Sequence, residues 1–253
     1  MKKTYRTIIQ ILLMLIVPFT LYSISPEEGQ ELIKNIDFSM NFDDTDFASV
    51  MTMISEDPES GIEKRVIQQY RRDSEDKFLM IFQEPVTQKG QGYLMIDDNL
   101  WFYDPESRKF SHTSMKEQFA QSDANNSDFG ESSIADDYKV VSVEEGKLGR
   151  FEVYVMQLEG LHNEVTYPNE KIWVTRDTNL ILKTEDSSAN GRVMRTSYFP
   201  SYAKISGKYM ATKIIFVDNL IGGKKTQITI SDISVEDLQN SLFTKAYVER
   251  VNR

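Results

Sequence analysis

The chain has 253 residues, of which 40% are hydrophobic and 27% are charged, and this balance indicates a folded globular protein. It contains no cysteine, which excludes disulfides, a thiol nucleophile, a cysteine metal site and the lipid-bearing cysteine of a bacterial lipoprotein. The formal net charge of −10 argues against binding nucleic acid or an anionic membrane surface through charge, although an acidic face can still meet a basic partner.

The N-terminus, residues 1–25, has the features of a secretory signal peptide. Three basic residues precede an apolar stretch over 8–22, and Ser23 and Ser25 are small residues at the spacing that signal peptidase reads. Removing the three basic residues would change the net charge from −10 to −13. The apolar stretch is short for a membrane span, which needs about 20 apolar residues. An uncleaved N-terminal membrane anchor is the alternative, because Pro26 directly after the cut hinders cleavage.

The region over 26–253 is expected to form a single domain rich in β-strands. It begins with a predicted helix over 26–36, which carries proline in its first turn and an apolar face. Turn signals then recur at regular spacing, Asn190-Gly191 being the strongest, and this favours antiparallel meanders in one incomplete barrel or curved sheet. The strands are predicted over 48–56, 62–72, 77–83, 90–96, 100–103, 138–144, 150–159, 171–175, 180–187, 192–199, 210–217 and 225–233.

The β pattern stops between residues 111 and 137. A short helix over 114–120 would place Met115 and Phe119 on one side. The polar residues that follow lack the glycine and glutamate spacing of a calcium-binding loop, so we expect a solvated loop there. A helical turn is also expected over 235–238.

Residues 90–105 form the most informative segment, because they predict a hairpin whose strands are apolar on both faces. Two apolar runs, 93–96 and 100–103, flank the polar tip Asp97-Asp98-Asn99. A strand exposed on one face alternates apolar with polar residues, whereas a strand covered on both faces does not. Residues 78–82 show the same pattern. A helix, another sheet or a bound apolar ligand must therefore cover the second face.

Signals for catalysis are weak. His112 and His162 are the only histidines, and the chain has no GxSxG elbow, P-loop or dinucleotide-binding glycine motif. Acidic pairs such as Asp97-Asp98 and Asp136-Asp137 fall at predicted turns or helix ends, where solvated carboxylates are ordinary. We therefore predict a protein that is not an enzyme and that needs no metal or cofactor. A lipid hydrolase using one of the histidines is the less favoured alternative.

The order of these elements, together with the sequences at 90–94, 100–105 and 242–247, resembles the outer-membrane lipoprotein-sorting family, LolA/LolB-like, in a LolA-like branch of uncharacterised members. The resemblance implies an incomplete β-barrel around an apolar cavity, with short helices acting as a lid. It also implies a periplasmic, non-enzymatic carrier that moves acyl chains of lipoproteins or phospholipids towards the outer membrane.

The resemblance further implies an inner-membrane donor complex and an outer-membrane acceptor as partners, and we expect a monomer. The absent cysteine argues against the membrane-anchored acceptor type. The functional arginine of the carrier has no clear counterpart, although Arg71 and Arg72 lie near the expected place in the sequence. A sensory or interaction module of the same fold, which binds lipid or envelope protein and signals to a partner, is the alternative function.

An empty apolar cavity would be unfavourable in water, so the lid should close onto apolar contacts when no cargo is bound. An error of one residue in strand parity would exchange the inner and outer faces. The predicted cavity-wall residues are Phe78, Met80, Phe82, Leu94, Ile96, Trp101 and Tyr103, and the predicted lid residues are Leu32, Ile36, Met115 and Phe119.

Overall fold

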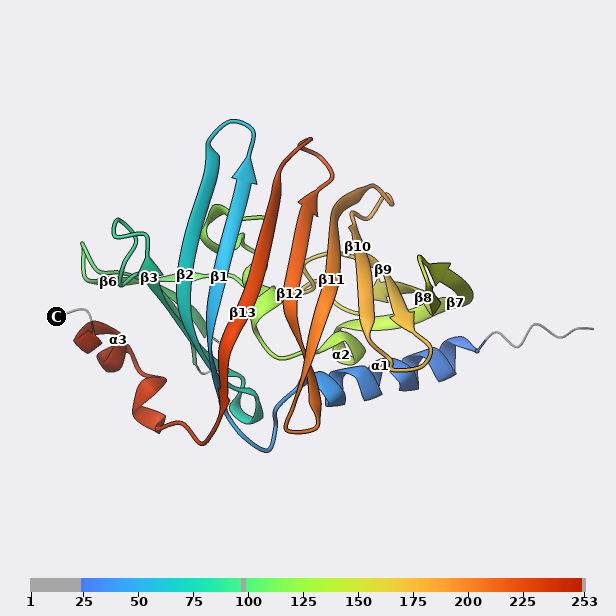
Figure 1. Ribbon diagram of the computed structural model, residues 1–253, viewed down its shortest axis with the longest axis horizontal. Helices are drawn as coiled ribbons and strands as arrows, with labels where there is room; N and C mark the ends of the chain where they lie inside the picture. The colour runs from blue at the N-terminus through green and yellow to red at the C-terminus, as the bar shows by residue number, and fades with distance from the viewer. Residues whose placement is uncertain (1–23, 97–98, 252–253) are drawn as a thin grey trace, which may run out of the picture.

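The computed structural model describes residues 24–96 and 99–251, and it places their strands in one 13-stranded sheet (Figure 1). The sheet is antiparallel, curved and open, so the prediction of a half-open antiparallel barrel is confirmed. Strands that follow each other in the chain pair, except that β6 and β7 form the two opposite edges of the sheet, and the first strand pairs with the last in its middle. The strands are β1 (Phe47–Asp57), β2 (Gly61–Arg72), β3 (Lys77–Glu84), β4 (Gly92–Ile96), β5 (Asn99–Asp104), β6 (Lys109–Thr113), β7 (Tyr138–Leu148), β8 (Phe151–Gly160), β9 (Asn169–Thr175), β10 (Ile181–Ser187), β11 (Val193–Ile205), β12 (Lys208–Asp218) and β13 (Lys225–Val235).

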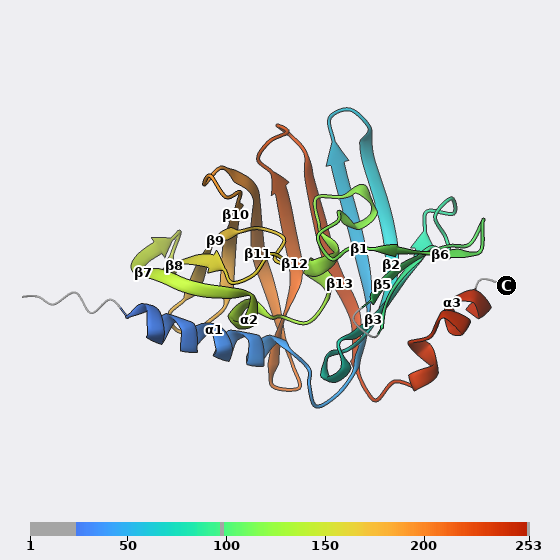
Figure 2. The same ribbon diagram turned by 180° about the vertical axis from the view of Figure 1, so that it is seen from behind.

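Short helices lie on both sides of this sheet (Figure 2). The α-helices are α1 (Pro26–Met40), α2 (Ile134–Asp137) and α3 (Lys245–Val251), and the 3-10 helices are η1 (Asp73–Glu75), η2 (Phe119–Gln121), η3 (Asn126–Phe129) and η4 (Asn240–Leu242). In the described part of the chain, none of the helices has the length and apolar character that a membrane span requires. The predicted signal peptide lies almost wholly outside the described residues, and so does the Asp97-Asp98 tip of the predicted hairpin.

Helix α1 confirms the predicted N-terminal helix and continues it to Met40. Ser25 caps its first turn, since the Ser25 hydroxyl accepts a hydrogen bond from Glu28 N (3.2 Å) and the Glu28 carboxylate accepts one from Ser25 N (2.7 Å). Ile33 and Ile36 are buried against the concave side of β7 to β10. This helix therefore covers one half of the concave face of the sheet, which we call the trough.

Gly29 marks the closest approach of α1 to the sheet. A Cβ atom at this position would lie 2.8 Å from Val143 Cγ2 and 3.1 Å from Val140 Cγ1. We expect Gly29→Ala to destabilise the protein by about 1–2 kcal/mol, because overpacking of about 1–3 kcal/mol outweighs the gain of nearly 1 kcal/mol in helix propensity. Urea unfolding measures this, with Lys34→Ala on the exposed side of α1 as the control. A variant as stable as the parent would show that α1 does not seat on β7 in this way.

Four local predictions are wrong. No solvated loop follows residue 120, because Ser122, Asp123, Asn125 and Asn126 are buried. Residues 114–120 do not form a helix, because Ala120 and Gln121 have φ values of 49° and 59° and only the single turn η2 forms. The predicted helical turn over 235–238 is instead the end of β13 and an extended connection. Strand β6, which extends the sheet beyond the hairpin, lies where no strand was predicted.

The C-terminal segment covers the convex side of β3 to β5 (Figure 1). Leu79 and Ile81 of β3 and Leu94 of β4 pack there against Phe243 and Val248. A protein element, rather than a ligand, therefore explains why these strands are apolar on that face.

Candidate functional site

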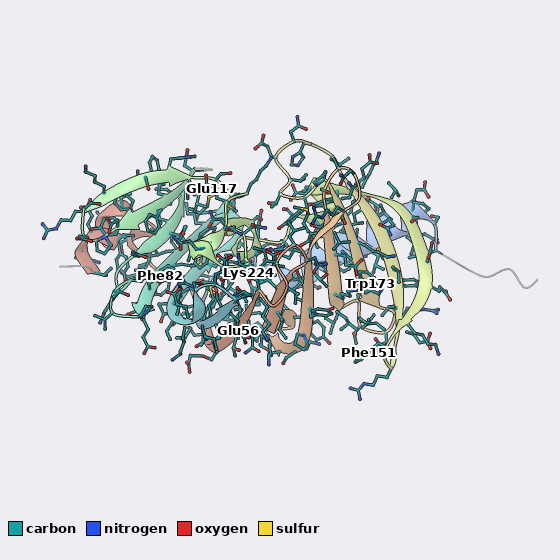
Figure 3. The ribbon with its side chains drawn as sticks, turned by 90° about the horizontal axis from the view of Figure 1, so that it is seen from above. Glu56, Phe82, Glu117, Phe151, Trp173 and Lys224 are labelled. Atoms are coloured by element: carbon teal, nitrogen blue, oxygen red, sulfur yellow. The ribbon has the colours of Figure 1, made fainter. Side chains whose placement is uncertain are left out.

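The concave face of β1 to β5 carries a buried apolar cluster. Phe78, Met80 and Phe82 of β3, three of the predicted cavity-wall residues, belong to it. Strand alternation places Met95 of β4 and Leu100 of β5 on this same face. This face is one candidate surface for a hydrophobic ligand. Figure 3 shows the molecule from above, with Phe82 of this face labelled.

Four other predicted wall residues lie on the opposite face, so the strand parity assigned to β4 and β5 is wrong. Leu94, Ile96 and Tyr103 pack in the convex cluster beneath α3. Trp101 has their parity, and Lys245 of α3 stands over its ring with Nζ 3.1 Å from the centroid. The physical reason is that both parities are apolar and the C-terminal segment, rather than the hydropathy pattern, determines which one it covers.

The concave apolar face is filled by residues 114–130, which we call the inner segment. Phe119 is fully buried, with its ring centroid 5.8 Å from that of Phe82, 4.6 Å from that of Tyr93 and 4.4 Å from that of Phe129. Ala124 is buried in the same cluster, and Met115 packs against it. The inner segment thus occupies the surface where an apolar ligand would lie.

The predicted lid residues fall into two separate groups. Leu32 and Ile36, which belong to α1, pack against the β7 to β10 half of the trough. Met115 and Phe119 pack with the inner segment on the β1 to β5 half. The two groups cover different parts of the concave face, so they do not form one continuous lid.

Arg195 of β11 anchors the inner segment to the sheet. Its guanidinium donates to both carboxylate oxygens of Asp128, at 2.6 and 3.0 Å, and to the Asp123 carbonyl at 3.3 Å. Its Nε donates to Asp186 Oδ2 at 2.6 Å. Burial opposes ionisation of Arg195, but the charges of Asp128 and Asp186 outweigh it and raise the pKa of the guanidinium above its ordinary value. This ion cluster links the inner segment to β10 and β11 of the sheet.

Sequence reasoning missed this cluster, although a signal for it was present. The turn at Asn190-Gly191 sets the register of β10 and β11, and that register places Asp186 opposite Arg195. A paired arginine and aspartate inside two otherwise half-apolar strands would have pointed to a buried ion pair. Asp128 was not predictable in this way, because 67 residues separate it from Arg195.

Arg71 and Arg72, the two arginines considered from the resemblance, make structural contacts within the protein. Arg72 donates to Asp46 (2.9 and 2.8 Å) and to the Leu238 carbonyl (2.7 Å), which ties the C-terminal segment to β2. Arg71 pairs with Asp73, and its guanidinium carbon lies 4.7 Å from the centroid of the Phe47 ring.

A cavity of about 650 Å³ lies between the inner segment, α2 and the concave face of β9 to β12. Met95, Leu100 and Phe216 line it and also belong to the apolar cluster, so the cavity borders the cluster that Phe119 covers. Its opposite wall is polar and includes Glu170, Asp186 and the Arg195 cluster. The cavity therefore joins an apolar surface to a charged one.

Glu131 lines this cavity as well, and its ionisation should affect stability. Burial, with the negative charges of Asp76 and Asp73, raises the pKa of Glu131 from 4.5 to about 7. The unfolded chain releases this proton near the ordinary pKa while the folded chain retains it, so the folded state loses stability as the pH rises from about 4.5 to 7.

Glu131→Gln cannot ionise, so its stability relative to the parent should rise across that pH range. We expect equal stability at about pH 4 and a more stable variant at about pH 8, measured by urea unfolding. Glu59→Gln in the exposed β1–β2 turn is the control for the loss of one negative charge. A gain that is the same at both pH values would contradict the assignment to Glu131.

The two histidines do not form a recognisable catalytic site in the described residues. His162 Nε2 lies 3.0 Å from Asp137 Oδ1 on a half-exposed surface, and the ring of His112 packs edge-on against Trp101. Within residues 24–96 and 99–251, no group of three or more histidine, aspartate and glutamate side chains is placed to hold a metal ion.

Comparison with known proteins places this geometry among solved folds. The chain is similar to a LolA superfamily protein from Nitrosomonas europaea, with 24% identity, a TM-score of 0.75 and coverage of 88% of this chain and 99% of that one. It is similar to a domain named for outer membrane lipoprotein sorting from Vibrio parahaemolyticus, with 20% identity, a TM-score of 0.79 and coverage of 89% and 100%. A DUF1329 family protein from Desulfovibrio piger gives 21% identity, a TM-score of 0.80 and coverage of 89% and 100%.

A family model described as "Uncharacterized protein" matches residues 74–250. No curated protein matches the chain. The structural likenesses show a LolA-like fold, and the family match covers most of the described sheet and the C-terminal segment.

Proposed function

This chain belongs to the family described as "Uncharacterized protein", whose model it matches over residues 74–250, and from its LolA-like fold we propose that it is a non-enzymatic carrier that binds acyl chains of lipoproteins or phospholipids. The proposal includes export to the periplasm through the signal peptide over 1–25. It also includes action as a monomer, with transfer from an inner-membrane donor complex towards an outer-membrane acceptor.

The observation that carries the proposal is the filling of the concave apolar face by the inner segment. Phe119 and Phe129 contact the wall as an apolar ligand would, yet a buried ion cluster and polar contacts hold the segment that bears them. Such a segment has two kinds of contact, and a ligand can replace the apolar ones. This arrangement suits a surface that must be covered when empty and uncovered when loaded.

The energies of the two states are comparable in this scheme. Burying an acyl chain contributes roughly 0.8 kcal/mol per CH₂ group, or on the order of 12 kcal/mol for a sixteen-carbon chain. Displacing the inner segment exposes its aromatic residues and opens the ion cluster, which offsets much of that gain. A small net difference keeps loading reversible, as a carrier requires.

A reversible covalent lock tests whether the inner segment must move. The hydroxyl oxygens of Ser127 and Thr166 lie 3.0 Å apart, so cysteines at these positions can join the inner segment to the β8–β9 connection. The chain has no other cysteine. We expect the oxidised Ser127→Cys/Thr166→Cys variant to take up lipid from vesicles at least tenfold more slowly than the reduced variant, as followed by native mass spectrometry.

Ser201→Cys/Thr212→Cys supplies the matched control. Its hydroxyl oxygens lie 2.9 Å apart between β11 and β12, away from the inner segment. Oxidation of this pair should not change lipid uptake. Equal uptake by the locked and unlocked inner segment would refute the exchange mechanism. If neither the parent protein nor any variant gains lipid from vesicles or from a lipoprotein, the carrier function itself is wrong.

A further inference from the structure

The charge of the cavity is unbalanced. Seven acidic side chains line it, against one lysine and one arginine. Arg195 is already paired with Asp128 and Asp186. Lys116 is exposed at the margin, where its ammonium donates to the Asn163 carbonyl. The cavity lining therefore holds more carboxylates than lysine and arginine side chains.

Glu170 of β9 is one of these carboxylates, and the Tyr138 side chain and the charge of Arg195 favour its ionised form. Among the described residues it forms no ion pair, while Tyr138, Asp186, Asp128 and Arg195 face it from four other elements. Burial, reinforced by the negative charge of Asp186, raises the pKa of Glu170 to about 8. Burial therefore favours the protonated, neutral form of Glu170 in the empty protein.

Ser197 of β11 provides a second, independent observation in the same cavity. Its side chain is 1% exposed and lines the cavity, yet its Oγ has no hydrogen-bond partner. Leaving a buried polar atom unpaired costs about 1–3 kcal/mol, so such an atom facing a cavity points to a ligand that completes it.

The apolar part of the cavity indicates where the hydrocarbon chain of a ligand would run. Ile181 and Phe199 lie on the same wall as Ser197, and Phe216 and Met95 connect this wall to the surface under Phe119. A ligand with a polar head near Glu170 would thus extend its chain towards the concave apolar face. An ammonium group has three donors and no acceptor, which matches a carboxylate and a free hydroxyl oxygen.

We propose that this cavity binds an amphiphile with a positively charged amine head, which donates to Glu170 and to Ser197 Oγ while its hydrocarbon chain runs towards the surface under Phe119. The inference rests on the proposed carrier function and narrows its cargo to amine-bearing lipids.

Three probes that share one hydrocarbon chain and differ in their head group test whether the site prefers an amine. Calorimetric titration of the delipidated protein at about pH 7 with dodecylamine, dodecanol and dodecanoate, each below its micelle concentration, isolates the effect of charge. We expect dodecylamine to bind at least tenfold more tightly than dodecanol, and dodecanoate to bind most weakly. Glu170→Gln should abolish the preference for the amine and leave dodecanol affinity within about twofold. Glu159→Gln, an exposed change of equal charge on β8, should keep the preference.

Two further readouts separate ligand contact from structural support. Because Ser197 Oγ has no partner in the empty protein, Ser197→Ala should not lower the melting temperature, yet it should weaken dodecylamine binding about threefold or more. Binding of the ammonium should also release a proton from Glu170 below about pH 8, detected as buffer-dependent binding enthalpy. The same titration of Glu170→Gln measures how much of the proton release comes instead from the neighbouring groups Tyr138, Asp186, Asp128 and Arg195.

The outcomes distinguish the two proposals. Equal binding of dodecylamine and dodecanol by the parent protein, or an amine preference that survives Glu170→Gln, would overturn the amine site while leaving an acyl carrier intact. Tightest binding of dodecanoate would also overturn it. Failure of all three probes to bind would instead count against the carrier function.

Discussion

Arg195→Met is expected to lower the free energy of unfolding by about 3–5 kcal/mol, because it leaves the buried carboxylate of Asp186 and the partly buried carboxylate of Asp128 without their positive partner. Asp186 and Asp128 both accept from the guanidinium at 2.6 Å, and methionine preserves much of the volume while removing every donor. The inner segment loses its ionic link to β10 and β11 at the same time. Urea unfolding measures the stability, and limited proteolysis within residues 114–130 should become faster.

Two variants make this result specific. Arg176→Met removes a half-exposed arginine paired with Glu145 at 3.0 Å, and such surface pairs contribute less than about 1 kcal/mol. Adding Asp128→Asn and Asp186→Asn to Arg195→Met removes the uncompensated charges and should recover part of the stability. If the triple variant is no more stable than Arg195→Met, the loss arises from packing rather than from buried charge.

Phe119→Ala is expected to destabilise the protein by about 3–5 kcal/mol, the range for truncating a fully buried phenylalanine. The same change vacates the surface beside Phe82 and Tyr93. Under the exchange mechanism, the variant should therefore bind acyl chains more tightly, because the competing aromatic contact is gone. Dodecanol titration measures the affinity, and chemical unfolding measures the stability.

Lower stability together with tighter dodecanol binding would identify Phe119 as a residue that covers the ligand surface. A phenylalanine that is permanent core would give the stability loss without any gain in dodecanol affinity, and that result would contradict its role in covering the site. Phe151→Ala at the exposed start of β8 is the control, and it should change neither quantity by much. Should Phe119→Ala prove too unstable to purify, Phe119→Leu retains burial and should show the same directions with smaller effects.

The predicted strands correspond closely to the observed ones because each carried its own turn signals and β-prone residues. Asn190-Gly191, for example, lies between β10 and β11 as expected. Local signals failed where backbone conformation was unusual. Ala120 and Gln121 adopt left-handed conformations that the sequence 114–120 does not reveal, so a helix was predicted where a single 3-10 turn forms.

The candidate site was only partly predictable. Phe78, Met80 and Phe82 were placed on one face, and the structure shows them together under Phe119. The polar side of the cavity was not predicted, because Glu170, Ser197 and Arg195 lie among strand residues of ordinary appearance. Their meaning depends on burial and on partners far along the chain.

By itself, the sequence determined that this protein is an antiparallel meander with some strands apolar on both faces, since residue alternation and turn chemistry are local properties. Only the tertiary structure decided which face became the concave one. In the 90–105 hairpin both parities bury equally well, and the C-terminal segment packs over Leu94 and Tyr103 while the inner segment packs over Met95 and Leu100. That choice depends on long-range contacts, which hydropathy along one strand does not encode.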